Sequence, residues 1–403
     1  MRTFGEKGGA WRCAGQDSLS FPHGYHERRA VAAYVPGRGS LRARVVGLRR
    51  CSVCLDAVVS SWGGSPVWQD WVVAAESKGA ALFAHMISGF AGPDDVDWTE
   101  AEEPADDGGV VIDVIAAGVS FADLLQTTGA YQMKMPLPYV PGMEAAGVVR
   151  FDRPEFGLGA GQRVAVLLSY GCWQEVLSAP PERILSLPDD LGFEAAAATP
   201  LNYLTGLFAL VTRAQARAGE TLLVHGGAGG VGTAAIQLGH ALGLRTVAVV
   251  GDEAKRAFAL RCGADHAVLH RGWLAAVHDL VGERAVDIVL DPVGGDRMTD
   301  SLRSLALEGR LVVVGFAAGE IPTVKVNRLL LANTAVIGAA SREFFEQHPA
   351  SVADLWGRLI DLRQAALLPD PPVQAYPFAD ARSALRAIAQ RKVRGKVVLS
   401  REV

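Results

Sequence analysis

One stretch limits the possible folds more than any other part of the sequence. An apolar run at residues 222–225 enters a glycine cluster, and an alanine-rich segment and a second apolar run at 246–250 follow. Runs of this kind and length indicate a strand, a tight turn, a helix and a second strand. Within the turn, Gly227, Gly229 and Gly232 have the G-x-G-x-x-G spacing that is typical of dinucleotide-binding turns.

Each of these three glycines is expected to have its own role. Gly227 allows the chain to leave the strand tightly, Gly229 lets the backbone approach a pyrophosphate, and Gly232 lets the helix pack on the strand. The pyrophosphate would accept hydrogen bonds from the free N–H groups at the helix N-terminus. The same candidate cofactor site includes the other residues of the turn, which are Ala228, Gly230 and Val231.

Composition narrows the choice of partners. The 403 residues are half hydrophobic and carry a formal net charge of −4, which suggests about two to three domains and gives no reason to expect nucleic acid or a membrane surface as partner. No apolar run reaches the roughly 18 residues of a membrane span. The five cysteines form no paired framework, as expected in a reducing cytoplasm. A small molecule is the expected partner.

The first 77 residues differ in composition from the rest of the chain. They hold three of the five cysteines and four of the eight tryptophans, without a clear helical or strand period. Cys51 and Cys54 lack the second ligand pair that a zinc site needs. We expect residues 1–77 to be an ill-ordered extension, or the product of a start site placed too far upstream. Mass spectrometry of the mature N-terminus would distinguish the two.

Two kinds of pattern follow in the rest of the chain. Between residues 78 and 199, short apolar runs alternate with Pro and Gly, with strands expected at 110–117, 161–166 and 171–177, and this favours a compact β-barrel-like domain. After residue 200, strands alternate with helical stretches. That alternation predicts an α/β fold with a doubly wound parallel sheet and a ligand at the carboxyl ends of its strands.

Four segments carry a resemblance to a known family. They are residues 117–123 (AGVSFAD), 138–144 (PYVPGME), 161–164 (GQRV) and 228–232 (AGGVG). The chain resembles the medium-chain dehydrogenase/reductase superfamily, and within it the zinc-independent NADPH:quinone oxidoreductase branch. The resemblance covers residues 78–403, which is the usual length of such chains and the second reason to set residues 1–77 apart.

The resemblance implies a domain plan and an assembly. It implies a GroES-like catalytic domain formed by residues 78–199 and 341–403, with a Rossmann nucleotide-binding domain at 200–340 between the two segments. It also implies a homodimer. Lys396, in the closing segment, could reach the cofactor, but we expect it to be a solvated surface lysine.

The resemblance also bears on metal binding. Zinc-dependent relatives place a cysteine ligand where this chain has Ser120, and a histidine where it has Met143. A neutral hydroxyl and a thioether are not normal zinc ligands, so we expect no metal. Ser120 becomes a candidate for contacting the cofactor instead. Asp123 matches a recurrent aspartate of the family, and we expect it to cap a helix rather than to act in catalysis.

The cofactor is expected to be NADPH, with NADH as the alternative. An acid at the end of the second strand would bind the ribose 2′-hydroxyl and select NAD. Asp252 lies about twenty residues beyond Gly232, near the usual distance, but the resemblance aligns the strand end with Val250. Lys255 matches a lysine that meets the 2′-phosphate in the family, and a phosphate needs cationic partners.

The remaining candidates surround the nicotinamide end. The resemblance assigns Asn202 and Thr205 to the segment that crosses from the catalytic domain, although both could simply cap a helix. Gly315 and Phe316 follow an apolar run and are expected to line the nicotinamide. Tyr131 matches a cleft-lining tyrosine that could steer a carbonyl or donate a proton, or could be a packing residue on a loop.

These features predict transfer of a hydride from NADPH to a quinone or another α,β-unsaturated carbonyl. This chemistry needs no metal, because the charge moves to an oxygen already conjugated to the attacked carbon. One alternative is an enoyl-thioester reductase, which would need a channel for coenzyme A or a carrier. Another is a non-catalytic NADPH-binding protein that acts as a sensor or in association with RNA. Loss of NADPH absorbance with three acceptor types would distinguish them.

Overall fold

The structure, a computed structural model, describes residues 81–104 and 108–403, together with the backbone of five short strands in the first 80 residues. The chain divides into two compact units, of which the first ends at Ala80 and the second begins at Ala81. The expectations for residues 1–77 and for Cys51 and Cys54 lie outside the described residues, apart from those backbone segments, and stay predictions. The five strands are β1 Gly5–Lys7, β2 Ala10–Arg12, β3 Ser18–Ser20, β4 Val31–Tyr34 and β5 Ala43–Val46.

The second unit contains a six-stranded parallel sheet, and we call this sheet together with the helices that cover it the parallel-sheet lobe. Its strand order is β15-β14-β13-β16-β17-β18, so the order reverses between β13 and β16. In a doubly wound sheet, ligands bind at the carboxyl ends of the strands beside such a reversal. The sheet confirms the predicted fold. Its strands are β13 Thr221–His225, β14 Arg245–Val250, β15 His266–Leu269, β16 Val286–Asp291, β17 Leu305–Val313 and β18 Ala335–Gly338.

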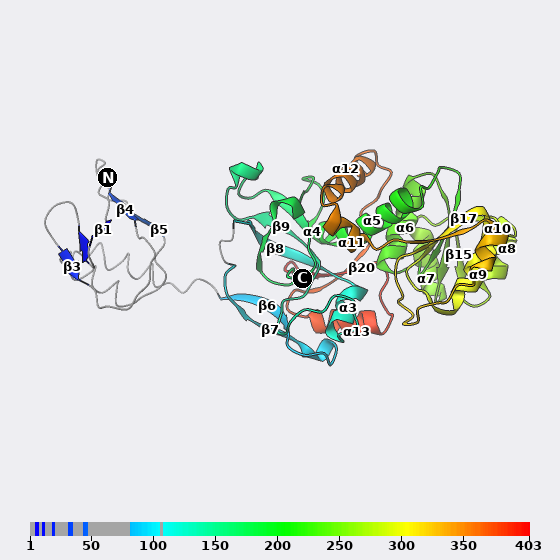
Figure 1. Ribbon diagram of the computed structural model, residues 1–403, viewed down its shortest axis with the longest axis horizontal. Helices are drawn as coiled ribbons and strands as arrows, with labels where there is room; N and C mark the ends of the chain where they lie inside the picture. Colours follow the sequence, from blue (N-terminus) through cyan, green and yellow to red (C-terminus); the bar gives the residue numbers. More distant parts are fainter. Residues whose placement is uncertain are drawn as a thin grey trace. The chain divides into compact units, whose positions relative to one another are not determined.

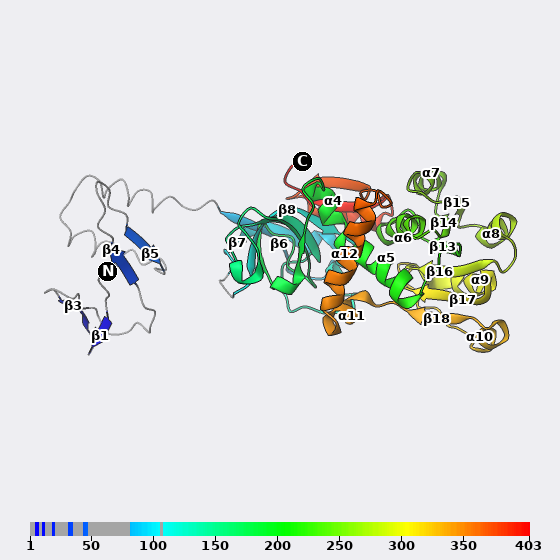
Figure 2. The same ribbon diagram turned by 90° about the horizontal axis from the view of Figure 1, so that it is seen from above.

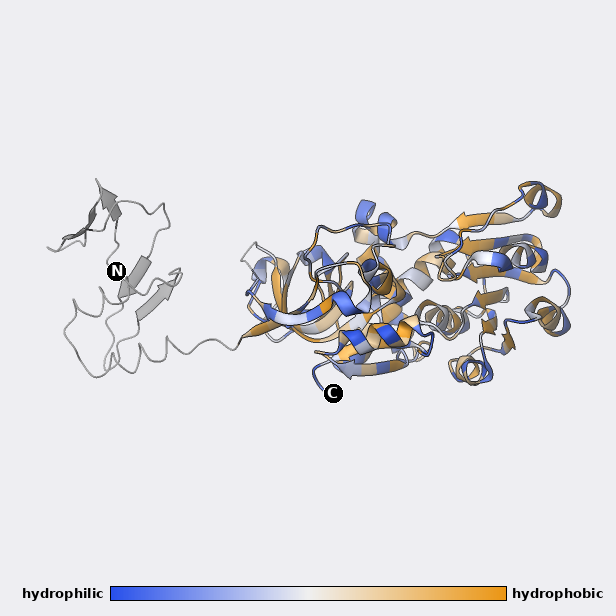
Figure 3. Cartoon of the chain, turned by 90° about the horizontal axis from the view of Figure 1, so that it is seen from below, coloured by the Kyte–Doolittle hydropathy of each residue, from blue (hydrophilic) through white to orange (hydrophobic). Residues whose placement is uncertain are grey.

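Helices cover both faces of this sheet (Figure 2). Because side chains alternate along a strand, Leu222 and Val224 join a core with α6 and α7, whereas Leu223 joins a second core with α8 and α9. Both faces are therefore buried, and the strands consist of apolar runs (Figure 3). The helices of this lobe are α5 Pro200–Leu207, a π-helix Phe208–Arg213, α6 Gly230–Ala241, α7 Glu253–Arg261, α8 Trp273–Val281, η5 Gly295–Arg297, α9 Met298–Ser304 and α10 Asn327–Ala332.

The other part of this unit is the β-rich lobe (Figure 1). Its main sheet has the order β12-β10-β9-β8-β20-β19, and β11 also pairs with β8. The strands are β6 Leu82–Ile87, β7 Val96–Ala101, β8 Val110–Val119, β9 Glu144–Val149, β10 Arg163–Leu167, β11 Val176–Ala179, β12 Ile184–Ser186, β19 Val373–Pro377 and β20 Lys396–Ser400. The helices near it are η1 Pro93–Asp95, α3 Phe121–Thr127, η2 Pro154–Phe156, η3 Pro181–Arg183, α4 Phe193–Ala198, α11 Ser341–Gln347, α12 Ala350–Gln364 and α13 Ala381–Ala389.

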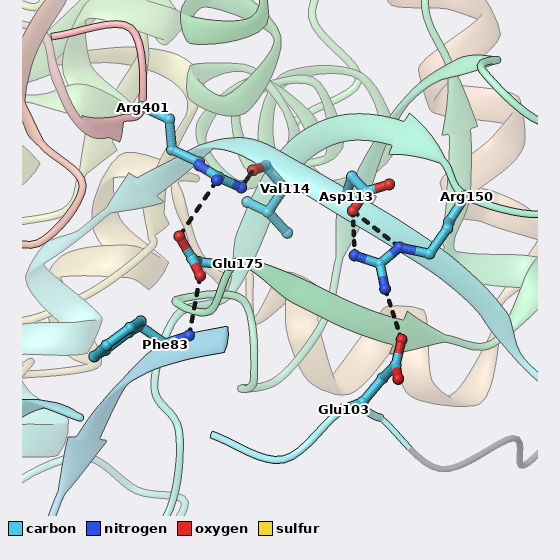
Figure 4. Close-up of polar contacts among 7 residues, drawn as sticks. All are labelled: Phe83, Glu103, Asp113, Val114, Arg150, Glu175 and Arg401. Atoms are coloured by element: carbon cyan, nitrogen blue, oxygen red, sulfur yellow. Dashed lines mark hydrogen bonds and ion pairs between the residues drawn. The ribbon is translucent and has the colours of Figure 1, made fainter. Parts of the chain in front are cut away.

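The C-terminal segment completes the sheet of the β-rich lobe. Strand β20 pairs antiparallel with β8, so residues nearly 300 positions apart in the sequence lie side by side. Beyond β20, Arg401 donates a hydrogen bond to the Val114 carbonyl at 3.3 Å and pairs with Glu175 at 3.3 Å, and Glu175 accepts from the Phe83 backbone N–H at 3.0 Å (Figure 4). Polar contacts thus connect the chain's end with β6 and β8.

The strand expected at residues 171–177 lies further along the chain, at 176–179. Gly171 has φ 94°, and the N–H groups of Cys172 and Trp173 donate to the carbonyls of Gly142 and Pro141. The start of this stretch is therefore bonded to another loop, and its next residues form an isolated bridge with β6, at Ala84 and Gln174, before β11 begins. Within the described residues, no helix is long and apolar enough to cross a membrane.

Candidate active site

The glycine turn follows β13 at the carboxyl edge of the parallel sheet. The residue with the left-handed conformation at the strand exit is Gly226, with φ 62°, so the role expected of Gly227 belongs to its neighbour. Gly227 is required for packing, because a Cβ there would lie 2.8 Å from the Ala248 Cβ. A Cβ on Gly232 would lie 2.2 Å from the Gly226 carbonyl oxygen. Gly232 therefore allows the start of α6 to pack closely on the backbone of the glycine turn itself, and its contact with the strand stays a prediction.

Gly229 differs from the glycines around it. It is the N-cap of α6 and has no side chain to cap the helix, and a Cβ there would meet only the Gly226 carbonyl oxygen, at 3.5 Å. The space beside Gly229 is therefore not filled by the protein. The backbone N–H groups of the first helical turn, from Gly230 onward, have no partners within the helix. This open cradle fits a pyrophosphate.

Helix α5 brings Asn202 to the turn and Thr205 to the start of α11. A Cβ on Gly230 would lie 2.4 Å from the Asn202 side-chain nitrogen, so Asn202 packs directly on the turn. Thr205, one turn further along α5, forms a hydrogen bond of 2.9 Å with the Ser341 hydroxyl. Ser341 begins α11 and was not identified from the sequence.

Tyr131 lies close to α11. The guanidinium carbon of Arg342 is 5.8 Å from the centre of the Tyr131 ring. Arg342 also donates to the Met133 sulfur at 3.0 Å and pairs with Glu343 at 2.5 Å. Burial raises the pKa of Tyr131 above its usual value of 10.0, with the nearby Arg342 opposing this effect. The hydroxyl is therefore protonated at neutral pH and can donate a hydrogen bond.

Gly315 and Phe316 follow β17 at the same edge of the sheet. A Cβ on Gly315 would meet only the Pro292 carbonyl oxygen, at 3.4 Å, and Phe316 is 39% exposed. The loop after β16 lies between these residues and the glycine turn, because a Cβ on Gly226 would lie 3.1 Å from the Val293 side chain. The three loops therefore lie together at the reversal of strand order.

A buried carboxylate shapes that middle loop. Asp291 is 1% exposed, and its Oδ1 atom accepts hydrogen bonds from the N–H groups of Val293 at 2.8 Å and Gly294 at 3.0 Å. Burial raises the pKa of Asp291, although these hydrogen bonds oppose the increase. Its contribution is to hold the loop conformation.

Lys255 lies in the first turn of α7, just beyond β14. Its Nζ atom donates to the Arg391 carbonyl at 2.6 Å and lies 4.0 Å from the Asp252 carboxylate. The other Asp252 carboxylate oxygen accepts from the Lys255 backbone N–H at 2.8 Å, so Asp252 is the N-cap of α7. The acid near the expected NAD-selecting position is thus engaged in capping a helix.

The loop at residues 390–395 connects the β-rich lobe with this site. Besides the contact of Arg391 with Lys255, the Gly395 N–H donates to the Ala228 carbonyl in the glycine turn at 2.9 Å. Nothing in the local sequence pattern pointed to this contact, because it joins residues more than 160 positions apart.

Ser120 caps α3 at the end of β8. Its hydroxyl donates to Asp123 Oδ2 at 2.6 Å, its backbone N–H donates to the same oxygen at 2.7 Å, and the Asp123 N–H donates back to the hydroxyl. This capping box confirms the helix-capping role expected for Asp123. Burial raises the pKa of Asp123 from 3.8 to about 6, with the bonds to Ser120 opposing this change.

The donor atoms available here do not match a zinc site. The Ser120 hydroxyl is engaged in the cap, and the Met143 side chain, which is 3% exposed, offers only a thioether. In residues 81–104 and 108–403, no group of three or more His, Cys, Asp or Glu side chains could hold a metal ion. Independence from zinc stays a prediction that rests on this donor chemistry.

Lys396 contradicts its expected exposure. It is 4% exposed and forms an ion pair with Glu144, which is fully buried. The other Glu144 oxygen accepts from the Leu201 N–H at 2.7 Å, next to Asn202 at the start of α5. The pair therefore connects β20, β9 and the helix that reaches the glycine turn. Strand β20 lies between β8 and β19, so both of its edges are paired, and helices α4 and α13 contact it.

Two family models match the chain. The alcohol dehydrogenase GroES-like domain matches residues 106–189, and the zinc-binding dehydrogenase model matches residues 230–356. The first match covers β8 to β12 of the β-rich lobe, and the second covers the parallel-sheet lobe from α6 onward.

Individual relatives span nearly the same region. Quinone oxidoreductase-like protein 2 of Bos taurus is 36% identical over 296 residues, which are 72% of this chain and 84% of the relative. A probable oxidoreductase from Mycobacterium abscessus has a TM-score of 0.73 and 39% identity, with 80% of this chain and 99% of that chain covered. The quinone oxidoreductase from Thermus thermophilus, also solved in complex with NADPH, has a TM-score of 0.67 and 36% identity, with 79% and 99% covered.

Proposed function

The chain belongs to the quinone oxidoreductase branch of the medium-chain dehydrogenase/reductase superfamily, and on that premise we propose that it is a zinc-independent reductase, which transfers hydride from NADPH to a quinone or another α,β-unsaturated carbonyl. The observation that supports this most is the open cradle at Gly229, at the same sheet edge as Gly315 and Phe316. A pyrophosphate in the cradle leaves the uncovered end of β17 for the nicotinamide.

The choice of NADPH rests on two observations. The Lys255 side chain places a positive charge just beyond the end of β14, and the nearby Asp252 carboxylate is engaged as the N-cap of α7. The Thermus thermophilus relative forms a complex with NADPH. A phosphate is stabilised by an ammonium donor, so Lys255 exchanges its bond to the Arg391 carbonyl for one to the 2′-phosphate.

The substrate lies beside Tyr131. When bound, NADPH supplies the hydride that adds to the β-carbon of the substrate. The Tyr131 hydroxyl donates a hydrogen bond to the carbonyl oxygen, where negative charge develops, and then transfers its proton. Arg342 lies over the Tyr131 ring and holds the ring in place. Ser120, held by its hydrogen bonds to Asp123 at the end of β8, stays a candidate for contacting the cofactor.

Consumption of NADPH with three acceptors tests the proposal. A benzoquinone, a simple enone and an enoyl-CoA are offered side by side to the full chain, with NADH in parallel. We expect NADPH loss with the quinone or enone. Lys255→Ala should raise the KM for NADPH by roughly tenfold or more, since a charge-assisted hydrogen bond contributes about 1.5–3 kcal/mol, and leave the KM for NADH unchanged. Arg256→Ala, on the same helix, is the matched control.

The other results point to the alternatives. Turnover restricted to the enoyl-CoA would indicate an enoyl-thioester reductase. Tight NADPH binding without turnover of any acceptor would indicate a non-catalytic NADPH-binding protein. Equal use of NADH, with Lys255→Ala unchanged, would contradict the choice of cofactor. The location in a reducing cytoplasm stays a prediction from cysteine content.

We further propose that two copies of the chain form a dimer through β18. This strand is the last in the sheet order, so one of its edges has no partner strand among the described residues. Next to it, Leu330 and Leu331 on α10 are 76% and 80% exposed, and Val326 is 75% exposed. An open strand edge beside exposed apolar side chains favours pairing with a second, two-fold related copy.

A further inference from the structure

A cavity of about 530 Å³ lies at the other end of α6 from the glycine turn. Its walls include Gln237 and His240 from α6, Cys262 at the end of α7, and residues 366–370 after α12. Gln237 is seven residues beyond Gly230, so with a rise of 1.5 Å per residue it lies about 10 Å along the helix. The cavity is thus separate from the cofactor cradle.

The volume is that of a small-molecule site, since such pockets span about 300–1,000 Å³. One wall is apolar and consists of Leu367, Leu368 and Pro369. A single inorganic ion would fill only part of this space. The shape and the apolar wall therefore suit a ligand with a compact hydrocarbon body.

The Gln237 side chain supplies a hydrogen-bond donor to the cavity. Gln237 is 4% exposed, and its Oε1 atom accepts a hydrogen bond from the Tyr203 hydroxyl. This bond fixes the amide with its nitrogen free, because the Nε2 atom has no hydrogen-bond partner among the residues that the structure describes and is not enclosed by protein. The Gln237 Nε2 atom is thus open to the cavity and can donate a hydrogen bond to an acceptor on a ligand.

The charged side chains that line the cavity balance, with Arg261 and Arg363 against Asp190 and Asp370, but they differ in whether they are already paired. Arg261 lies 6.0 Å from the Phe258 ring centre and pairs with no carboxylate within the described part of the chain. The two acids of the cavity, Asp190 and Asp370, are both held by Arg363, at 2.8 Å and 2.9 Å. Arg261 is therefore the cation that is free to meet a ligand. Burial raises the pKa of Cys262, so its thiol stays neutral.

We propose that this cavity is a second ligand-binding site, which takes a small organic carboxylate with an apolar body. The carboxylate accepts from the Gln237 amide and from Arg261, while the hydrocarbon part lies against Leu367 and Leu368. No covalent step is involved. Because Asp190 follows β12 and Gln237 lies on α6, a bound ligand contacts both lobes, with α12 between them (Figure 2).

Ligand-observed NMR titration of the full chain tests the proposal. The probes are benzoate, hexanoate and 4-phenylbutyrate, each compared with its primary amide, with and without saturating NADPH. We expect saturable binding of at least one carboxylate, roughly tenfold tighter than its amide, as loss of one charge-assisted hydrogen bond implies. NADPH should not displace it.

Matched variants locate the binding. Arg261→Gln should weaken the carboxylate roughly tenfold, whereas Arg256→Gln, outside the cavity on the same helix, should not. Gln237→Leu is made together with Tyr203→Phe, so that no buried partner is left unpaired, and Tyr203→Phe alone is its control. The bound carboxylate should also slow alkylation of Cys262, measured by peptide mass spectrometry, which does not depend on any variant folding.

The proposal is overturned by any of four results. These are the absence of saturable binding by all three carboxylates, equal binding of the amides, equal weakening by Arg261→Gln and Arg256→Gln, and displacement by NADPH. The last would place the ligand in the cofactor cradle. None of these results depends on whether the enzyme reduces a quinone.

Discussion

At the scale of single residues, the proposed proton transfer depends on Tyr131. Its hydroxyl is protonated at neutral pH, since its pKa lies above the usual value of 10.0, and a positioned acid contributes typically a factor of 10²–10⁴ to turnover. Tyr131→Phe should therefore lower kcat about 100-fold and leave the affinity for NADPH unchanged, measured by steady-state kinetics and cofactor fluorescence. Tyr170→Phe, at an exposed tyrosine, is the control. Full turnover by the Tyr131 variant would assign the proton to another group.

Asp123 gives the fold a pH dependence of its own. Its pKa is 3.8 when exposed and about 6 in the folded protein, so the folded state binds this proton more tightly than the unfolded state. The stabilisation is complete below about pH 4 and is lost as the pH rises through 6. Above that, ionised Asp123 lowers the free energy of unfolding by up to about 3 kcal/mol.

The isosteric variant isolates this effect. Asp123→Asn keeps an oxygen that can accept from the Ser120 N–H and cannot ionise. The variant's stability relative to the natural protein should rise between pH 4 and pH 7, which urea unfolding at several pH values measures. A stability difference that stays constant across this range would mean that Asp123 ionises as it does in water.

Several residue-level features lay beyond sequence reasoning. A lysine in a basic segment is typical of a surface position. The fold instead buries Lys396 in β20, which pairs with β8 and β19, and its charge is paired with Glu144. The helix cap by Asp123 was predictable, because a capping box is a local pattern. The assignment of the strand exit to Gly227 instead of Gly226 was wrong by one residue, since backbone conformation within a glycine cluster leaves no sequence signal.

At the scale of elements, two glycines of the same turn should respond differently to a methyl group. Gly232→Ala places a Cβ 2.2 Å from a backbone oxygen, so we expect strong destabilisation. Gly229→Ala places its Cβ in open space, 3.5 Å from the nearest protein atom. It should keep the melting temperature within a few degrees and weaken NADPH binding roughly tenfold or more.

Thermal unfolding and cofactor fluorescence measure the two effects separately. If Gly229→Ala unfolded the protein as Gly232→Ala does, the space beside Gly229 would be structural and not a cradle. If Gly229→Ala bound NADPH normally, the pyrophosphate would lie elsewhere.

The order of elements was predictable where the pattern is local. Strands β13, β14 and β16, and helix α6, follow from apolar runs and from the glycine turn. Strand β11 was placed too early, because the stretch beginning at Gly171 is apolar enough for a strand but donates its N–H groups to the 141–142 loop. Contacts between distant segments, such as Gly395 with Ala228, have no local signal at all.

At the scale of the whole molecule, the exposed leucines on α10 predict the assembly. Leu331→Asp should weaken the dimer at least tenfold, since a buried charge opposes an apolar interface, and sedimentation velocity should then show a larger monomer fraction. Leu260→Asp on α7, at a leucine that is 44% exposed, should leave the assembly unchanged. A natural protein that is already monomeric at high concentration would contradict dimer formation through β18.

Each of the two lobes supplies part of what the proposed metal-free hydride transfer needs. The parallel-sheet lobe supplies the cradle at Gly229, and the β-rich lobe supplies Tyr131 and contacts the glycine turn through the hydrogen bond from Gly395 to Ala228. Ser120 and Met143 stand where zinc ligands would be required.

The most direct test follows a deuterium atom in the chelator-treated enzyme. NADPH labelled with deuterium on one face of the nicotinamide C4 is oxidised with an enone, and the product is analysed by NMR. We expect deuterium on the β-carbon of the product when one of the two C4 faces is labelled and not when the other is. The rate should be the same before and after chelator treatment. Deuterium released to water, or activity that disappears with chelation and returns with zinc, would contradict metal-free hydride transfer.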